Sequence, residues 1–240
     1  MKAIVVIPTY NECENIPPLV DSLLRHEGVR VLVVDDDSPD GTGAVADEAT
    51  RRHPGRVDVL HRTSNRGLGR SYIDGIARAI AMGPDLICQM DADFSHDPAA
   101  LPSLLAAADR ADVVIGSRYI AGGGVVNWPA RRLLLSRFAN WYVRAITHLD
   151  ARDCTSGYRC WRREALASLP LDRFVSDGYS FLVEMLFVAA RQGRRITEVP
   201  ITYVERREGQ SKMSRGVILE SAITPWRLVA RPKTARPTVR

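Results

Sequence analysis

Short apolar runs alternate with helix-like segments through the first half of this 240-residue chain. The runs are continuous stretches rich in Val, Ile and Leu, as in strands buried on both faces, and they cover residues 3–7, 31–34, 57–60, 86–88 and 113–118. Segments with apolar residues at helical spacing lie between them, near residues 15–25, 45–49, 71–82 and 98–108. This alternation predicts an α/β fold, with a mostly parallel central sheet covered by helices on both faces.

Polar motifs follow four of these predicted strands, at residues 8–12, 35–40, 91–95 and 117–118. In an open parallel sheet, ligands bind beyond the carboxyl ends of the strands. Those ends meet at one edge, so we expect the four motifs to lie close together. This edge is the predicted functional site.

Asp91 and Asp93 are the strongest candidates for chemistry within these motifs. Residues i and i+2 of an extended segment point to the same side, so both carboxylates can aim at one point. Hard oxygen ligands of this kind suit Mg²⁺ or Mn²⁺ holding a diphosphate. The alternative is that they are two loop acids beside a helix capped by Asp97.

Several classes of function are disfavoured by the motifs that the chain lacks. Residues 8–12 contain no Gly, and Gly67-Leu68-Gly69 lacks the third Gly of a dinucleotide fingerprint. There is no Walker A sequence, so a nicotinamide or P-loop enzyme is disfavoured. The Arg residues are scattered and form no nucleic-acid-binding motif. The net charge of +5 suits an anionic substrate or an anionic membrane surface.

The sequence predicts a cytoplasmic protein. The four Cys residues have no zinc-site spacing and are expected to be reduced thiols. The chain enters a strand directly after Met1-Lys2, without the features of a signal peptide. No apolar run approaches the ~18 residues needed to span a bilayer, so we expect the protein to be soluble or to lie on a membrane.

After Arg118 the pattern changes. Gly122 to Gly124 is predicted to be a hinge or a plain linker. A basic helix follows at 131–147, in which Leu134, Phe138, Trp141, Tyr142 and Ala145 share a face. It could lie at a membrane interface or pack on the sheet with a solvated basic side.

The rest of the chain is predicted to complete one catalytic domain, residues 1–215. A helix is expected at 179–191, and an edge strand containing Pro200 at 196–204. The basic loop 206–212 could clamp a diphosphate or be a solvated loop. Residues 216–240 are predicted to form an amphipathic segment with a basic tail.

Five motifs together resemble the family 2 inverting glycosyltransferases of the GT-A fold. Within these, the chain is most similar to the dolichol-phosphate, or polyprenol monophosphomannose, synthases. The likeness covers about residues 1–220 and rests on residues 8–12, 34–42, 91–96, 116–119 and 209–212. It implies GDP-mannose as donor, a polyprenyl phosphate as acceptor and Mg²⁺ or Mn²⁺ as cofactor.

The resemblance also implies roles for individual residues. Those expected to hold the guanosine are Pro8, Tyr10, Glu12, Val34 and Asp36. Those expected to bind the donor diphosphate are Asp91, Ala92, Asp93, Arg206 and Lys212. The metal is expected at Asp91, Asp93 and Ser95, although some relatives have Gln in place of Ser95. The acceptor phosphate is expected at Arg118, Arg132 and Ser136, and the catalytic residues are Asp91, Asp93 and Arg118.

The chemistry of such a transfer agrees with the residues present. A lipid phosphate is already an anion, so it needs positioning and charge screening more than a general base. The motifs offer Arg residues for this purpose and no obvious catalytic His. Attack opposite the leaving GDP would give a β-linked mannosyl phosphate.

Two alternatives to this function, and the source of membrane contact, stay open at the level of sequence. The chain could use another nucleotide sugar, such as UDP-glucose, or a soluble acceptor. It could also bind a nucleotide sugar without catalysis. Contact with the cytoplasmic face of a membrane would come from the helix at 131–147, from residues 217–230, or from a separate membrane-anchor protein.

Overall fold

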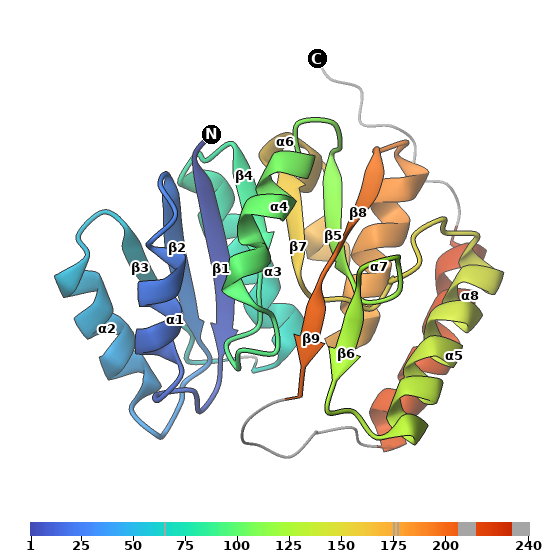
Figure 1. Cartoon of the computed structure of the whole chain (residues 1–240), viewed down its shortest axis with the longest axis horizontal. Helices are drawn as coiled ribbons and strands as arrows, with labels where there is room; N and C mark the ends of the chain where they lie inside the picture. Colours follow the sequence, from blue (N-terminus) through green and yellow to red (C-terminus); the bar gives the residue numbers. More distant parts are fainter. Residues whose placement is uncertain (65, 175, 177, 206–214, 232–240) are drawn as a thin grey trace.

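Figure 1 shows the computed structural model of the chain, which describes all residues except 65, 175, 177, 206–214 and 232–240. Helices cover both faces of a central sheet, as the alternation of the sequence predicts. One face carries α1 (Ile16–Leu23) and α4 (Leu101–Ala107). The other carries α3 (Leu68–Ala81) and α7 (Gly178–Arg191).

The central sheet has seven strands among the described residues, in the order β3-β2-β1-β4-β7-β5-β8. All are parallel except β7, which runs antiparallel to both of its neighbours. Their bounds are β1 (Ala3–Thr9), β2 (Val29–Asp35), β3 (Val57–His61), β4 (Leu86–Gln89), β5 (Val113–Ser117), β7 (Arg159–Arg162) and β8 (Ile196–Pro200). The five strands predicted from apolar runs are all confirmed.

Strand β1 explains why such runs are continuous. Its Val5 and Ile7 pack into the core on the α1 side, whereas Ile4 and Val6 pack into the core on the α3 side. All four side chains are fully buried. A strand covered on both faces needs an apolar residue at every position, not at every second one.

Strand β7 was not predicted. It lies between β4 and β5 and begins with a charged residue, Arg159, which is unusual in a buried strand. That side chain is fully buried and donates to the backbone oxygens of Cys154, Ser156 and Leu182 at 2.6–2.9 Å. Burial lowers the pKa of Arg159 to about 10. Hydrogen bonds to two nearby carbonyls and to the distant carbonyl of Leu182 thus make an Arg acceptable inside the sheet.

The predicted edge strand is confirmed, but it consists of two successive strands, β8 and β9 (Thr202–Val204). Strand β8 lies at the edge of the central sheet and ends at Pro200, and β9 follows after Ile201. Strand β9 pairs in parallel with β6 (Gly124–Val126) to form a small second sheet. The last residue of the predicted Gly hinge is therefore part of a strand. Gly122 has φ of +85°, a conformation that favours glycine.

Helix α5 (Ala130–Thr147) confirms the predicted basic helix and packs against α8 (Arg215–Ala230), as Figure 1 shows. Its buried residues are Asn140, Val143 and Thr147. By contrast, Leu134, Phe138 and Trp141 are 57–66% exposed. Much of the apolar face predicted for this helix therefore points outward instead of onto the sheet.

Of the remaining helices, α2 (Thr42–Arg52) packs beside α1 on the same face, against β3, and the others are short. These others are η1 (Pro98–Ala100), α6 (Arg163–Ala167) and η2 (Leu171–Arg173). In the part of the chain that the structure describes, no helix is long and apolar enough to cross a lipid bilayer. The boundary predicted at residue 215 stays a prediction, and α8 packs on both α5 and α7.

Candidate active site

The predicted motifs gather at one edge of the sheet, the lower one in Figure 1. The parallel strands β1, β2 and β4 all end there. Two of the loops are tied to each other by hydrogen bonds. The backbone N–H of Asp36 donates to the carbonyl of Thr9 at 3.0 Å, and the N–H of Glu12 donates to Thr42 Oγ1 at 2.9 Å. The loops after β1 and β2 therefore form one surface.

This surface contains the residues expected to bind a nucleoside. Pro8 and Val34 are neighbours in the sheet register, but the Val34 side chain is fully buried in the core. The carbonyl of Val34 accepts from Thr9 Oγ1 at 3.2 Å, so Val34 supports the loop after β1 from below. The Tyr10 ring is 37% exposed, with the Arg66 guanidinium carbon 5.6 Å from its centroid. Tyr10 thus offers an aromatic face for a base.

Asp36 is held by a buried basic residue that the sequence reasoning missed. Arg62 follows β3, is 6% exposed and forms an ion pair with Asp36. It also donates to Asp74 at 2.7 Å and to Ser71 at 2.9 Å. The other oxygen of Asp36 accepts from the N–H of Gly67 at 2.8 Å. The carboxylate of Asp36 is therefore fixed in place by two elements distant in the sequence.

The Asp91-Ala92-Asp93 motif begins two residues after the end of β4 at Gln89. The Asp91 carboxylate is 29% exposed and accepts from the hydroxyl of Tyr72 at 3.3 Å. Burial raises the pKa of Tyr72, so that hydroxyl stays protonated. Asp93 is 7% exposed and accepts from the backbone N–H of Ser95 at 3.0 Å. The structure therefore brings both carboxylates to the predicted edge of the sheet, where Asp91 and Asp93 form an acidic corner.

These residues fit a divalent cation that also binds the ligand. Ser95 is fully buried, and its Oγ has no hydrogen-bond partner among the described residues. No group of three His, Cys, Asp or Glu side chains in the described residues is arranged to hold a metal alone. Mg²⁺ and similar cations are commonly held by one or two carboxylates together with substrate phosphates and water. The carboxylates of Asp91 and Asp93 match that pattern.

His96 supports this corner, although no role was predicted for it. Its Nδ1 accepts from the backbone N–H of Asp91 at 3.2 Å. Its ring stacks on Tyr158 with 5.1 Å between centroids and is 1% exposed. Burial lowers the pKa of His96, which keeps the ring neutral and Nδ1 able to accept. His96 therefore positions the backbone of Asp91.

Arg118 is the most constrained of the predicted site residues. Its Nε and Nη2 donate to the two carboxylate oxygens of Asp153, each at 2.7 Å, and Nη2 also donates to Thr155 at 2.8 Å. Burial alone would lower the pKa of Arg118, but the adjacent carboxylate outweighs it and raises the pKa. The same pairing lowers the pKa of Asp153 despite burial. Arg118 is thus a fixed positive charge.

Arg132 and Ser136 lie close to this fixed charge. The guanidinium carbon of Arg132 is 4.3 Å from the centroid of the Trp128 ring, and that of Arg118 is 5.7 Å from it. Arg132 also pairs with Glu205. Ser136 Oγ accepts from the hydroxyl of Tyr119 at 2.7 Å. The three residues expected to bind the acceptor phosphate therefore form one basic corner.

Tyr203 connects the basic corner to the acidic one. Its ring centroid is 5.5 Å from the Arg118 guanidinium carbon and 5.6 Å from the His96 ring. Strand β9, which carries Tyr203, also donates from Val204 to the carbonyl of Ser95 at 3.2 Å. The metal-binding candidates and the phosphate-binding candidates are therefore neighbours in space. Arg206 and Lys212, the predicted diphosphate clamp, lie outside the described residues.

The family model described as Glycosyl transferase family 2 matches residues 4–169, more than half of the chain. The chain belongs to glycosyltransferase family 2. The matched range includes both corners of the site. It ends before the segment that holds β8, β9 and α8.

Two relatives are similar to this glycosyltransferase over nearly their whole length. It is 47% identical to the undecaprenyl-phosphate mannosyltransferase of Micrococcus luteus, covering 96% of each chain. It is 46% identical to the polyprenol monophosphomannose synthase of Mycolicibacterium smegmatis, covering all of this chain and 92% of the relative. The resemblance noted in the sequence is confirmed.

A solved structure supports the fold. It is the glucosyl-3-phosphoglycerate synthase of Mycobacterium tuberculosis in complex with Mn²⁺, UDP-glucose and phosphoglyceric acid. The TM-score is 0.68 at 20% identity, over 93% of this chain and 79% of the other. The predicted GT-A fold of this family 2 glycosyltransferase is thereby confirmed.

Proposed function

We propose that the chain transfers mannose from GDP-mannose to a polyprenyl phosphate and gives a polyprenyl β-mannosyl phosphate. The observation that carries this proposal is the acidic corner beside the basic corner at the carboxyl edge of the sheet. A nucleotide-sugar diphosphate requires the first, and an acceptor phosphate requires the second. The names of the two relatives described above agree with this pairing.

The donor occupies the loops after β1, β2 and β4 in this proposal. Tyr10 presents its exposed ring to the guanine base, and Asp36, held by Arg62, faces the nucleoside. Asp93 and Asp91 hold a divalent cation, Mg²⁺ or Mn²⁺, with Ser95 beside them. When bound, this cation neutralises charge on the departing diphosphate. Arg206 and Lys212 are proposed to contact the same diphosphate.

The acceptor phosphate lies against Arg118, Arg132 and Ser136 in this proposal. Arg118 presents a positive charge that Asp153 keeps in one orientation. Arg132 is partly exposed and can turn towards a lipid phosphate. The phosphate oxygen is already deprotonated, so no side chain needs to remove a proton before it attacks.

The reaction is a single displacement at the anomeric carbon. A phosphate oxygen of the acceptor forms a bond to C1 of mannose while the bond from C1 to the diphosphate oxygen breaks. The electron pair of that bond leaves with GDP. Attack from the opposite face inverts the configuration, which turns an α-linked donor into a β-linked product.

The lipid acceptor places the chain at a membrane surface, and we propose the cytoplasmic face. Large apolar side chains are exposed on both helices of the α5–α8 pair, among them Phe138, Trp141 and Trp226. The two helices are joined by a hydrogen bond from Trp226 Nε1 to the hydroxyl of Tyr142 at 2.9 Å. If the purified chain fails to bind vesicles that contain anionic lipid and polyprenyl phosphate, a separate anchor protein must supply the contact.

A donor panel tests the proposed reaction. Purified chain, MgCl₂ or MnCl₂ and polyprenyl phosphate are incubated with radiolabelled GDP-mannose, UDP-glucose or UDP-N-acetylglucosamine. We expect labelled lipid only from GDP-mannose. Transfer from a UDP-sugar alone would favour a different GT-A transferase, and no transfer from any donor would favour a binding protein without catalysis.

A further inference from the structure

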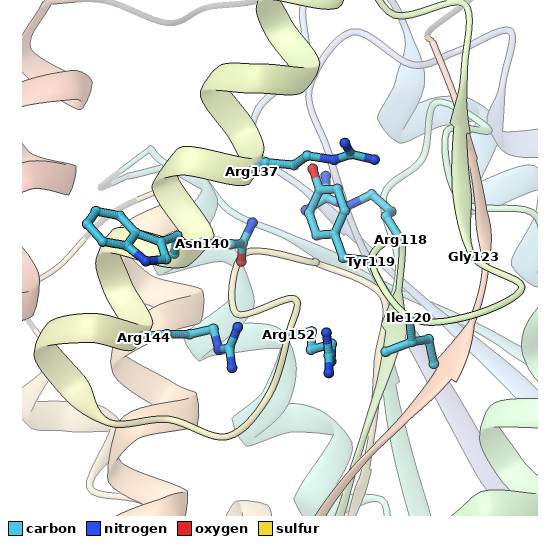
Figure 2. Close-up of a pocket in the computed structure, with 9 residues that line it drawn as sticks. Arg118, Tyr119, Ile120, Gly123, Arg137, Asn140, Arg144 and Arg152 are labelled. Carbon is cyan, nitrogen blue, oxygen red and sulfur yellow. The ribbon is translucent and has the colours of Figure 1, made fainter.

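A second group of basic residues surrounds a cavity beside the corner proposed for the acceptor phosphate, with Arg118 on the border of both. The cavity has a volume of about 330 Å³ and lies between helix α5 and the loop that follows β5. Figure 2 shows Arg137 and Arg144 extending from the helix towards this loop, with Asn140 between them. Arg152 reaches the cavity from the segment after α5, and Ile120 lines the opposite wall.

The positive charge around this cavity is not balanced by nearby acids. Among the described residues, Arg137, Arg144 and Arg152 form no ion pair with their side chains. The Nε atom of Arg144 is shielded from solvent and has no hydrogen-bond partner within the described part of the chain. A buried donor without an acceptor is unfavourable, and an anion bound within hydrogen-bond reach would remove that penalty.

Two carboxylates border the region: Asp153 is neutralised by Arg118, whereas Glu198 keeps one negative charge against the three Arg side chains. Asp153 is paired with Arg118 at the inner wall. Glu198 accepts from the backbone N–H groups of Arg152 and Asp153 at 2.8 and 3.0 Å. Neither one forms an ion pair with the three Arg side chains in the described structure. The cavity is therefore a concave surface of positive charge, which attracts an anion.

The cavity adjoins the corner proposed for the acceptor phosphate and shares Arg118 with it, but the other two residues of that corner lie elsewhere. Arg132 and Ser136 do not line it. Tyr119 stands between the two places, because its ring lines the cavity and its hydroxyl donates to Ser136. Arg118 borders both. The chain thus has room for a second phosphate beside the first.

Apolar side chains next to the cavity indicate what carries that phosphate. Trp141 lines the cavity and is 61% exposed. Phe138 lies 5.7 Å from it between ring centroids, and Leu134 is one helical turn further along the same side. A ligand with a phosphate next to hydrocarbon chains satisfies both the Arg cluster and this exposed apolar row.

We propose that the cavity binds the phosphate headgroup of an anionic membrane phospholipid, whose acyl chains lie along Leu134, Phe138 and Trp141. This lipid is distinct from the acceptor and is not consumed. It fixes helix α5 at the membrane surface, so that Arg132 on the same helix meets the acceptor phosphate at a defined depth. The inference deepens the proposed membrane contact and does not depend on which sugar donor is used.

Vesicle binding by the full chain tests this proposal without donor or acceptor. Vesicles of phosphatidylcholine, with or without phosphatidylglycerol, are titrated against the wild type and the Arg144→Gln/Arg152→Gln variant. The control, Arg25→Gln/Arg78→Gln, removes the same charge from exposed positions elsewhere. We expect the first variant to bind phosphatidylglycerol vesicles about thirtyfold more weakly and the control to be within about twofold of wild type. Equal binding by the two variants would overturn the proposal.

A variant that keeps every charge separates a cavity from diffuse attraction. Ile120→Trp fills the space while the net charge stays the same. We expect it to bind phosphatidylglycerol vesicles about tenfold more weakly than wild type, with an unchanged thermal unfolding midpoint. Binding equal to wild type would show that only the general charge of the surface matters and would contradict the assignment of a site.

Titration with soluble phosphates is the third experiment, and it tests whether the cavity binds a phosphate that is not part of a lipid. Inorganic phosphate and sn-glycerol 3-phosphate are titrated into the wild type by calorimetry, and we expect affinities no tighter than the millimolar range. If either compound binds tightly, and if the wild type and the Arg144→Gln/Arg152→Gln variant bind vesicles equally well, the cavity is a site for a soluble phosphate and the lipid proposal is wrong. Mannose transfer is measured separately, so its failure would refute the proposed reaction and leave this result unaffected.

Discussion

The acidic and basic corners of the site are held in place in different ways. Asp91 and Asp93 lie in a loop, where they accept neutral hydrogen bonds from Tyr72 and from a backbone N–H. Arg118 is locked by two charged hydrogen bonds to Asp153, which is fully buried. The acidic corner is therefore completed by its ligand, whereas half of the basic corner is organised before any ligand binds.

This difference predicts different effects of mutation in the two corners. Changes at the acidic corner should lower activity and leave stability nearly intact. A change at Asp153, which supports the basic corner, should lower both activity and stability, because the buried charge of Arg118 would lose its partner. The four substitutions below test this contrast, beginning with the largest expected effect.

Asp93→Asn should have the largest effect, a fall of about a thousandfold in mannose transfer. Asn keeps an oxygen that can accept from the N–H of Ser95 but loses the charge needed to hold the cation. Transfer rates are measured across a range of MnCl₂ concentrations, and stability by thermal unfolding. The control is Asp97→Asn, which keeps an N-cap and should be active. Near-normal transfer by Asp93→Asn would refute the metal assignment.

Asp153→Ala should reduce the free energy of unfolding by about 3–5 kcal/mol, because Arg118 would remain buried without a partner. Transfer should fall as well, since the guanidinium loses its orientation. Chemical denaturation measures the first effect. The exposed acid Glu48, which pairs with Arg51 and Arg52 on α2, provides the control. If Glu48→Ala and Asp153→Ala are equally stable, the basic corner is not preorganised by this pair.

Arg132→Ala should raise the KM for polyprenyl phosphate about thirtyfold and leave the KM for GDP-mannose unchanged. The pair with Glu205 is partly exposed, so thermal stability should change little. Arg131→Ala, at the exposed neighbouring position, is the matched control. A rise in the donor KM instead would move Arg132 out of the acceptor site.

Tyr119→Phe should have the smallest effect, a loss of about fivefold in transfer. It removes the hydroxyl that donates to Ser136 and keeps the ring beside Arg118. Steady-state kinetics with varied acceptor measure the change. Tyr142→Phe removes a hydroxyl that bonds to Ala222 on α8 and should keep full activity. Identical kinetics for both variants would remove Ser136 from the proposed acceptor site.

Local sequence patterns predict the strands and the strand-end motifs well, because both depend on short spacings. Strand β1 is apolar throughout as a result of being covered on both faces, and Asp91 and Asp93 simply follow the next strand of the sheet. The edge of the sheet that holds the site could therefore be predicted without the structure.

The supporting residues could not be predicted, because their roles depend on contacts between distant segments. Arg62 reaches Asp36 across 26 positions of the sequence, and Asp153 reaches Arg118 across 35. Arg159 is compatible with a buried strand because three backbone carbonyls accept its hydrogen bonds, and one of them, that of Leu182, lies 23 positions away in α7. His96 stands inside a predicted motif, yet its role requires Tyr158 as a stacking partner.

The most direct test of the central claim is the position of a bound cation and phosphate relative to the two corners. Crystals of the full chain with GDP, MnCl₂ and a short polyprenyl phosphate would be measured at a wavelength where manganese scatters anomalously. We predict a manganese peak at ligand distance from the Asp93 carboxylate, with the lipid phosphate against Arg118 and Arg132. A manganese peak elsewhere, or a lipid phosphate bound away from both Arg residues, would contradict the account.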